Sequence, residues 1–185
     1  MAVKLERRLL SVHDYHLMSD AGILTGDDRV ELLNGEIVTR SPIGSKHAGY
    51  VGKITAVLNK ILDGKAIIFP QNPIKISDYS EPEPDISVLL LRDDFYISRL
   101  PEPGDIYLVI EVSDSTLEKD REVKLPLYAL AGIPEVWIVN INDEQIEVHS
   151  QPREDVYTLR RLLDRSDVLT LPIEGINLPA SRIWK

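Results

Sequence analysis

The segment EPEPDISVLLL, residues 81–91, places two glutamates and two prolines before an aspartate and a run of apolar residues. A second segment, DIYLVIEVSDST (105–116), has a similar apolar run with Glu111 near its end. Such runs are typical of strands in the middle of a sheet that is covered on both faces. The sequence therefore predicts two buried strands, with Asp85 at the start of the first and Glu111 near the end of the second.

An antiparallel pairing of these strands would place Asp85 beside Glu111, because directly opposed side chains lie ~5 Å apart. Two carboxylates at that distance repel each other and are unfavourable to bury. They can share a proton as an acid–base pair, or they can bind a cation. Because the chain has no cysteine, its oxygen ligands favour a hard ion such as Mg²⁺ or Mn²⁺.

The segment LEKDREVKLPLYALAG (117–132) follows Glu111 and has a helical pattern. Asp120, Lys124 and Tyr128 are four residues apart, so they share one helical face. We expect Lys124 to point back toward Glu111, where its ammonium could hold an attacking water or stabilise charge that develops on a phosphorane. Pro126 should kink this helix or begin a new turn.

Two earlier residues are candidates for the same end of the sheet. Glu31 lies in RVELLNGEIV (29–38), which reads as a β-hairpin because Asn-Gly is a strong two-residue turn signal. His47 begins a long predicted helix, where it could polarise water or contact substrate. A purely structural interpretation pairs Glu31 with Arg29 or Arg40.

The remaining patterns complete the predicted fold. Ser11 opens a short helix over about residues 12–20, with Asp14 in a capping box. SPIGSKHAGYVGKITAVLNKILDG (41–64) has apolar residues at helical spacing, whereas EVWIVNI (135–141), QIEVHS (145–150) and VYTLRRLL (156–163) read as strands. We predict an α/β fold, one mixed sheet flanked by helices, in a single domain spanning residues 1–185.

Composition limits the function classes. The 21 basic and 30 acidic residues give a net charge of −9, which argues against a protein that coats nucleic acid. A small basic groove, or a metal that screens the carboxylates, is compatible with that charge. No run of about 18 apolar residues is present, so no membrane span is expected. The start, MAVKLERRLLSV, lacks the apolar stretch of a secretory signal. We therefore expect a cytoplasmic protein.

Several motifs in order carry a family resemblance: RVELLNGEIV (29–38), SPIGSKH (41–47), EPDISV (83–88), LVIEVSDST (108–116), DREVK (120–124) and YALAGIPEVWIVN (128–140). Together they resemble the Uma2 family, also called DUF820, of restriction endonucleases in the PD-(D/E)XK nuclease superfamily. The resemblance covers roughly residues 10 to 150. It implies a restriction endonuclease-like α/β core, a divalent metal that is usually Mg²⁺, and hydrolysis of DNA phosphodiester bonds.

The resemblance also implies residue roles. Asp85 looks like the aspartate of the "PD" and Glu111 like the acidic residue of "(D/E)XK", with the backbone carbonyl of Val112 as a further metal ligand. Glu31 is similar to the acidic residue that the superfamily supplies from an earlier element. Position 113 is a serine where the motif has lysine, and the family's pattern assigns the lysine role to Lys124.

Two alternatives remain open from the sequence. One is a non-catalytic member of the same fold that binds nucleic acid or a protein partner. The other is a metal-free hydrolase in which Asp85 and Glu111 form an acid–base pair. Either DNA or RNA could be the substrate, and a homodimer would suit cutting both strands of a duplex.

Overall fold

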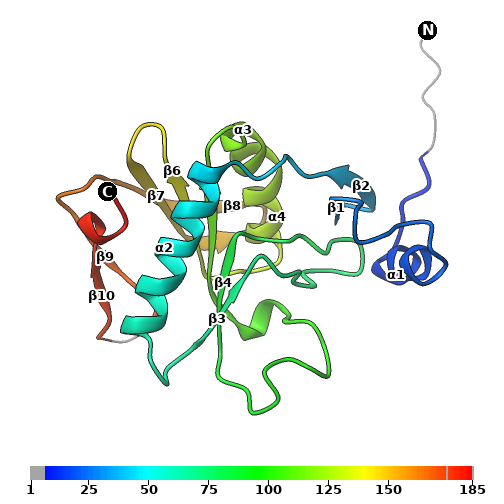
Figure 1. Ribbon diagram of the computed structural model, residues 1–185, viewed down its shortest axis with the longest axis horizontal. Helices are drawn as coiled ribbons and strands as arrows, with labels where there is room; N and C mark the ends of the chain where they lie inside the picture. The colour runs from blue at the N-terminus through cyan, green and yellow to red at the C-terminus, as the bar shows by residue number, and fades with distance from the viewer. Residues whose placement is uncertain (1–6, 174, 185) are drawn as a thin grey trace, which may run out of the picture.

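The central feature of the computed structural model, which describes residues 7–173 and 175–184, is a mixed sheet of six strands. Their order is β3-β4-β5-β6-β7-β8 (Figure 1). The strands are β3 (Ile67–Pro70), β4 (Ile86–Leu89), β5 (Ile106–Ser113), β6 (Glu135–Asn140), β7 (Gln145–Arg153) and β8 (Val156–Leu163). Only β5 and β6 pair in parallel within this sheet. The predicted mixed α/β fold is confirmed.

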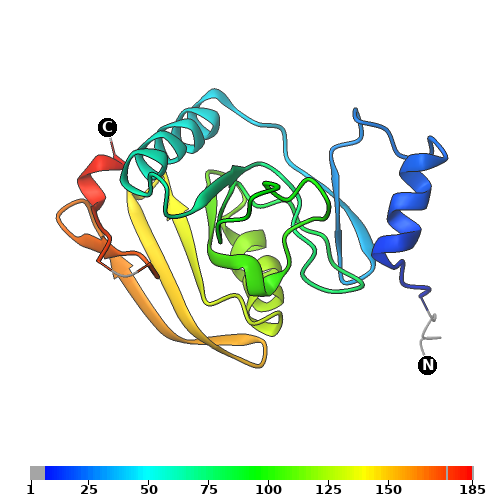
Figure 2. The same ribbon diagram turned by 90° about the horizontal axis from the view of Figure 1, so that it is seen from below.

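Helices cover both faces of the sheet. The long helix α2 (Ser45–Ile61) packs on one face, and α4 (Leu125–Leu130) packs on the other. Figure 2 shows the two helical segments on opposite sides of the strands. In β6, Trp137 packs into the cluster under α2, whereas Ile138 packs into the cluster under α4. The central strands are therefore buried on both faces, which explains their continuous apolar runs.

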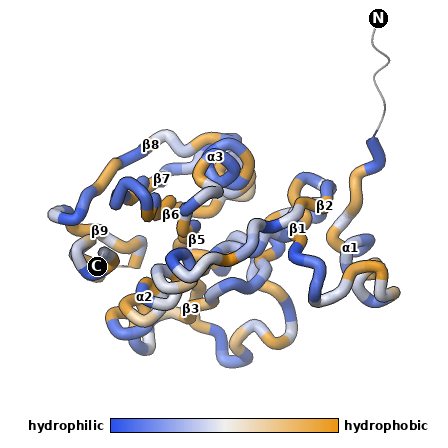
Figure 3. The backbone as a smooth tube through the Cα atoms, turned by 45° about the horizontal axis from the view of Figure 1, so that its top comes forward, coloured by the Kyte–Doolittle hydropathy of each residue, from blue (hydrophilic) through white to orange (hydrophobic). Residues whose placement is uncertain are grey.

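Figure 3 shows the same layering by hydropathy: the tube is mainly hydrophobic through β5 and β6 and changes between hydrophobic and hydrophilic along β8. The strand β8 lies at the edge of the sheet, and most of its residues are exposed or half-buried. On the central strand β6, by contrast, the side chain of Trp137 is fully buried.

The C-terminal region was not assigned from the sequence. It contains a two-stranded sheet of β9 (Val168–Thr170) and β10 (Asn177–Pro179), followed by a single 3₁₀ turn over Ala180–Arg182. Leu169, Leu178 and Trp184 join the apolar cluster under α2. This region therefore extends the core on that face. None of the helices in the described ranges is long and apolar enough to cross a lipid bilayer.

An N-terminal unit lies beside the main sheet (Figure 1). It consists of α1 (Val12–Asp20) and the hairpin of β1 (Val30–Leu33) and β2 (Glu36–Thr39). The capping box predicted for Ser11 and Asp14 is present. The hairpin turn is also confirmed, since Asn34 and Gly35 have φ angles of 50° and 75°, as a type I′ turn requires.

Replacement of Gly35 by alanine is expected to destabilise the protein by about 2 kcal/mol or more. A Cβ at this position would lie 2.6 Å from Leu9 Cβ, and the φ of +75° is already unfavourable for any other residue. Thermal unfolding measures the effect. Gly26→Ala is the matched control, because nothing lies within 4 Å of its added Cβ; equal melting temperatures for the two variants would contradict the prediction.

The helical segment after β5 is not a uniform α-helix. It contains α3 (Leu117–Lys119), a π-helical turn (Asp120–Lys124) and then α4. The backbone N–H of Leu125 donates to the carbonyl of Asp120, five residues earlier. Pro126 lies in the first turn of α4, so the prediction that it begins a new turn is confirmed. Because proline clashes with the carbonyl four residues before it, the wider turn accommodates the ring.

Candidate active site

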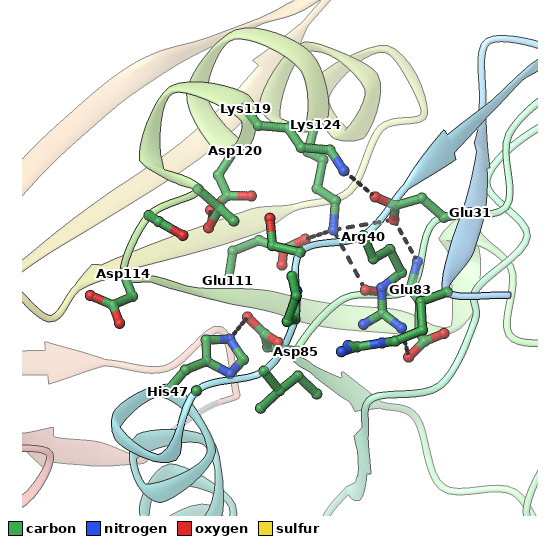
Figure 4. Close-up of a pocket in the computed structure, with 17 residues that line it drawn as sticks. Glu31, Arg40, His47, Glu83, Asp85, Glu111, Asp114, Lys119, Asp120 and Lys124 are labelled. Atoms are coloured by element: carbon green, nitrogen blue, oxygen red, sulfur yellow. Dashed lines mark hydrogen bonds and ion pairs between the residues drawn. The ribbon is translucent and has the colours of Figure 1, made fainter. Parts of the chain in front are cut away.

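A pocket of about 80 Å³ opens where β4 begins and β5 ends (Figure 4). Its wall comes from the hairpin, the loop before α2, the start of α2, the segment before β4, the end of β5 and the π-helical turn. The titratable side chains that line it are Arg29, Glu31, Arg40, His47, Glu83, Asp85, Glu111, Asp114, Lys119, Asp120 and Lys124. The structure thus brings together Glu31, Asp85, Glu111 and Lys124, the four side chains singled out from the sequence.

Asp85 and Glu111 meet because β4 and β5 are antiparallel, as predicted. Ile86 pairs with Ile110, so one further step in the same register places Asp85 opposite Glu111. Asp85 Oδ2 accepts a hydrogen bond from the backbone N–H of Val112 at 2.8 Å. Both carboxylates are buried, so neither is a solvated residue at the end of a strand.

His47 lies on the α2 side of Asp85, and its Nε2 is 3.0 Å from Asp85 Oδ2. The first turn of α2 therefore holds this carboxylate in place. The hydrogen bond to Asp85 raises the pKa of His47, although partial burial of the ring opposes the shift. The structure thus places His47 beside the carboxylate, where it can orient Asp85.

Glu111 is held from the opposite side by the helical segment. Its Oε1 accepts hydrogen bonds from Lys124 Nζ at 3.0 Å and from the Tyr128 hydroxyl at 2.6 Å. The helical face predicted from four-residue spacing therefore does point back over β5. Tyr128 is fully buried, so it packs in the core as well as making this polar contact.

Glu31 enters from β1 and is almost completely buried. Its Oε1 accepts a hydrogen bond from Lys119 Nζ at 2.8 Å, and its Oε2 lies 3.3 Å from Lys124 Nζ. The backbone N–H of Glu83 donates to Oε2 at 3.2 Å. The structural interpretation, an ion pair with a nearby arginine, is wrong: the partners are lysines of the helical segment, and Arg40 pairs with Glu83 instead.

Asp120 is a further buried carboxylate that lines the pocket. Its Oδ2 accepts hydrogen bonds from the hydroxyls of Ser113 and Thr116, each at 2.7 Å. Ser113, at the position where the family motif has lysine, therefore orients a carboxylate. Lys124 bonds with Glu111 rather than pairing with Asp120.

The ionisable side chains in the pocket lie close enough to shift one another's pKa values. Burial raises the pKa of Glu111 to about 8, Asp120 and Asp85 act in the same direction, and Lys124 opposes them. Burial also raises the pKa of Asp120. Burial opposes protonation of Lys124, but Glu111 and Glu31 outweigh it and raise the pKa of the ammonium. Lys124 is therefore a permanent cation among partly protonated acids.

Glu31 behaves in the opposite way from Glu111. Burial disfavours its ionised form, but Lys124 and Lys119 together outweigh that effect and lower its pKa. Glu31 is therefore an ionised partner of both lysines, whereas burial favours the protonated form of Glu111. The acidic groups at this end of the sheet exceed what the neighbouring lysines neutralise.

The carboxylate oxygens of the pocket can be compared with the ligands that a metal ion requires. Across the described ranges, neither Asp85 Oδ1 nor Glu111 Oε2 has a hydrogen-bond partner. The same ranges hold no group of three or more His, Cys, Asp or Glu side chains arranged to coordinate one ion. Mg²⁺ commonly uses only one or two carboxylates and keeps several waters. Two free carboxylate oxygens therefore fit such an ion.

Similarity to known proteins shows the family and the fold of the chain. The sequence model of one family, Uma2, described as "Putative restriction endonuclease", matches residues 12–181. A crystal structure described as a putative nuclease belonging to DUF820, from Anabaena variabilis ATCC 29413, aligns with a TM-score of 0.74. The alignment covers 95% of this chain and 97% of that chain at 13% identity, so it establishes a shared fold. No curated protein matches the chain.

Proposed function

Because the chain belongs to the Uma2 family, we propose that it is a metal-dependent endonuclease that hydrolyses phosphodiester bonds in DNA. The observation that carries the proposal is the pair of buried, opposed carboxylates, Asp85 and Glu111, with an ammonium bound to one of them. Burying like charges together is unfavourable unless they serve a cation or share a proton. The family match favours the cation.

In this proposal Asp85, Glu111 and the backbone carbonyl of Val112 hold Mg²⁺ or Mn²⁺. Such an ion polarises a phosphate and lowers the pKa of a bound water. The chain itself supplies the orientation: His47 and the Val112 N–H hold Asp85, while Lys124 and Tyr128 hold Glu111. Fixed geometry of this kind is what brings a reacting water and a phosphate together productively.

Glu31 has a supporting part. It ties the hairpin to the helical segment through Lys119 and Lys124, so it keeps two ammonium groups at the wall of the pocket. Arg29 and Arg40 line the same pocket. These cations can contact phosphate groups of a nucleic acid once a metal ion offsets the excess of carboxylates in the same pocket.

Asp85→Asn is expected to lower the cleavage rate at least about 100-fold and to weaken Mg²⁺ binding, because one anionic oxygen is lost. The amide oxygen still accepts the Val112 N–H, so the free energy of unfolding should change by less than about 2 kcal/mol. Cleavage of plasmid DNA, calorimetric titration with Mg²⁺ and thermal unfolding measure the three effects. Asp63→Asn, an exposed carboxylate, is the control.

The two alternative functions, a metal-free hydrolase and a non-catalytic binding protein, predict different results in these assays. Cleavage that persists in EDTA would support a metal-free acid–base pair, and retained cleavage in Asp85→Asn would contradict the assigned role. Absence of both cleavage and millimolar Mg²⁺ binding in the unmodified protein would support a non-catalytic binding protein. Parallel assays with single-stranded DNA, duplex DNA and RNA identify the substrate. Light scattering tests whether the protein forms a homodimer, which would present two sites.

A further inference from the structure

We infer that Lys119 is the lysine that contacts the scissile phosphate or its attacking water, and that Lys124 is a positioning residue. The inference rests on the proposed nuclease function and changes the role that the motif resemblance gives to Lys124. It follows from the acceptors that surround each ammonium, from the exposure of each side chain and from the π-helical turn that begins directly after Lys119 and ends at Lys124.

Lys124 is enclosed by buried acceptors. Its Nζ donates hydrogen bonds to Glu111 Oε1 at 3.0 Å and to the carbonyl of Glu83 at 3.5 Å, and it forms an ion pair with Glu31 Oε2 at 3.3 Å. Its side chain is only 7% exposed. To donate to a water or a phosphate, Lys124 would have to release a buried carboxylate, which is unfavourable.

Lys119 has fewer acceptors around its ammonium, and its side chain is more exposed. Its Nζ donates to Glu31 Oε1 at 2.8 Å and to the carbonyl of Thr39 at 3.4 Å, which leaves one N–H without an acceptor in the ranges that the structure describes. Its side chain is 26% exposed and lines the pocket. Lys119 can therefore donate to a bound phosphate while Glu31 holds the ammonium in position.

The π-helical turn explains how both lysines reach one carboxylate. Residues five apart in an α-helix point about 140° away from each other, since each residue advances by about 100°. A turn closed by bonds between residues five apart stacks those residues instead. The turn over Asp120–Lys124 begins directly after Lys119 and ends with Lys124, so Lys119 and Lys124 both face Glu31 (Figure 4).

Three variants test the inference in the full-length protein. Lys119→Met is expected to reduce the single-turnover cleavage rate of a labelled duplex with Mg²⁺ about 100-fold. Lys119→Arg should recover part of that rate, because the guanidinium keeps the charge and several donors. Lys60→Met removes an exposed charge at the far end of α2 and should leave the rate unchanged. Thermal unfolding should show that Lys119→Met remains folded at the assay temperature.

The outcomes separate the inference from the proposed function. If the unmodified protein and Lys60→Met cleave while folded Lys119→Met is at least about 30-fold slower with unchanged Mg²⁺ affinity, the inference holds. If Lys119→Met cleaves within threefold of the unmodified protein, the inference is overturned while the nuclease function stands. If the unmodified protein cleaves no nucleic acid, the proposed function fails and the inference falls with it.

Discussion

Glu111→Gln is expected to abolish cleavage and at the same time to stabilise the metal-free protein at pH 8. The loss of cleavage follows because the amide cannot serve as an anionic metal ligand, and we expect a reduction of at least about 100-fold. The fold should tolerate the change well. Gln Oε1 can accept the same hydrogen bonds from Lys124 and Tyr128 that Glu111 Oε1 accepts now.

The gain in stability follows from the raised pKa of Glu111, which burial shifts from 4.5 to about 8. An acid whose pKa is higher in the folded state contributes its full stability below the unfolded pKa and loses it as pH rises through the folded pKa. Between pH 4.5 and pH 8, this carboxyl therefore weakens the folded state by up to about 1.4 kcal/mol for each pH unit. Glutamine does not titrate, so the variant avoids this loss.

The measurement is thermal unfolding of both proteins in EDTA at pH 5 and pH 8. The difference in melting temperature, variant minus unmodified protein, should be small at pH 5 and clearly positive at pH 8. Equal differences at the two pH values would show that Glu111 is ionised in the metal-free protein. Glu118→Gln, which removes an exposed carboxylate on α3, controls for the loss of one charge.

Lys124→Met should have the largest effect on stability, about 3–5 kcal/mol, because the buried Glu31 carboxylate loses an ionic partner and buried Glu111 loses a hydrogen-bond donor. Glu31 and Glu111 are 1% and 4% exposed, so water cannot replace the ammonium. Lys119→Met should be milder, since Glu31 would keep Lys124 and the backbone N–H of Glu83. Denaturant unfolding at pH 7 compares the variants.

A triple variant distinguishes charge from packing. Lys124→Met combined with Glu31→Gln and Glu111→Gln removes the buried ammonium together with the two glutamates that it contacts, and such replacements are often neutral or stabilising. We expect it to regain most of the stability lost in Lys124→Met while remaining inactive. A triple variant as unstable as Lys124→Met would show that the lysine stem, not its charge, supports the fold.

Local patterns in the sequence predicted most of the fold. The Asn34-Gly35 turn, the capping box at Ser11 and the apolar runs of β5 and β6 each have a direct physical cause, and each element forms where it was expected. The C-terminal β9 and β10 were missed because they are three residues long. Such short strands depend on packing against the core and give no periodic signal.

Local patterns in the sequence also predicted part of the candidate site. The approach of Asp85 to Glu111 follows from two adjacent strands, and that of Lys124 from helical spacing. Lys119 was not identified because α-helical periodicity places it on a different face from Lys124. Only the π-helical turn places Lys119 on the same side as Lys124. Apart from Pro126, no sequence pattern indicates that turn.

The separation of the site's parts along the chain has a consequence for biosynthesis. Glu31 arrives from the N-terminal hairpin, whereas Lys124 and Tyr128 follow β5. Contacts between such distant segments form late, because the intervening chain must first be ordered. A nascent chain that has not yet been released from the ribosome as far as α4 would lack the Lys124 ammonium, which contacts both Glu31 and Glu111. Under the proposed nuclease function, unfinished copies would therefore not cleave nucleic acid.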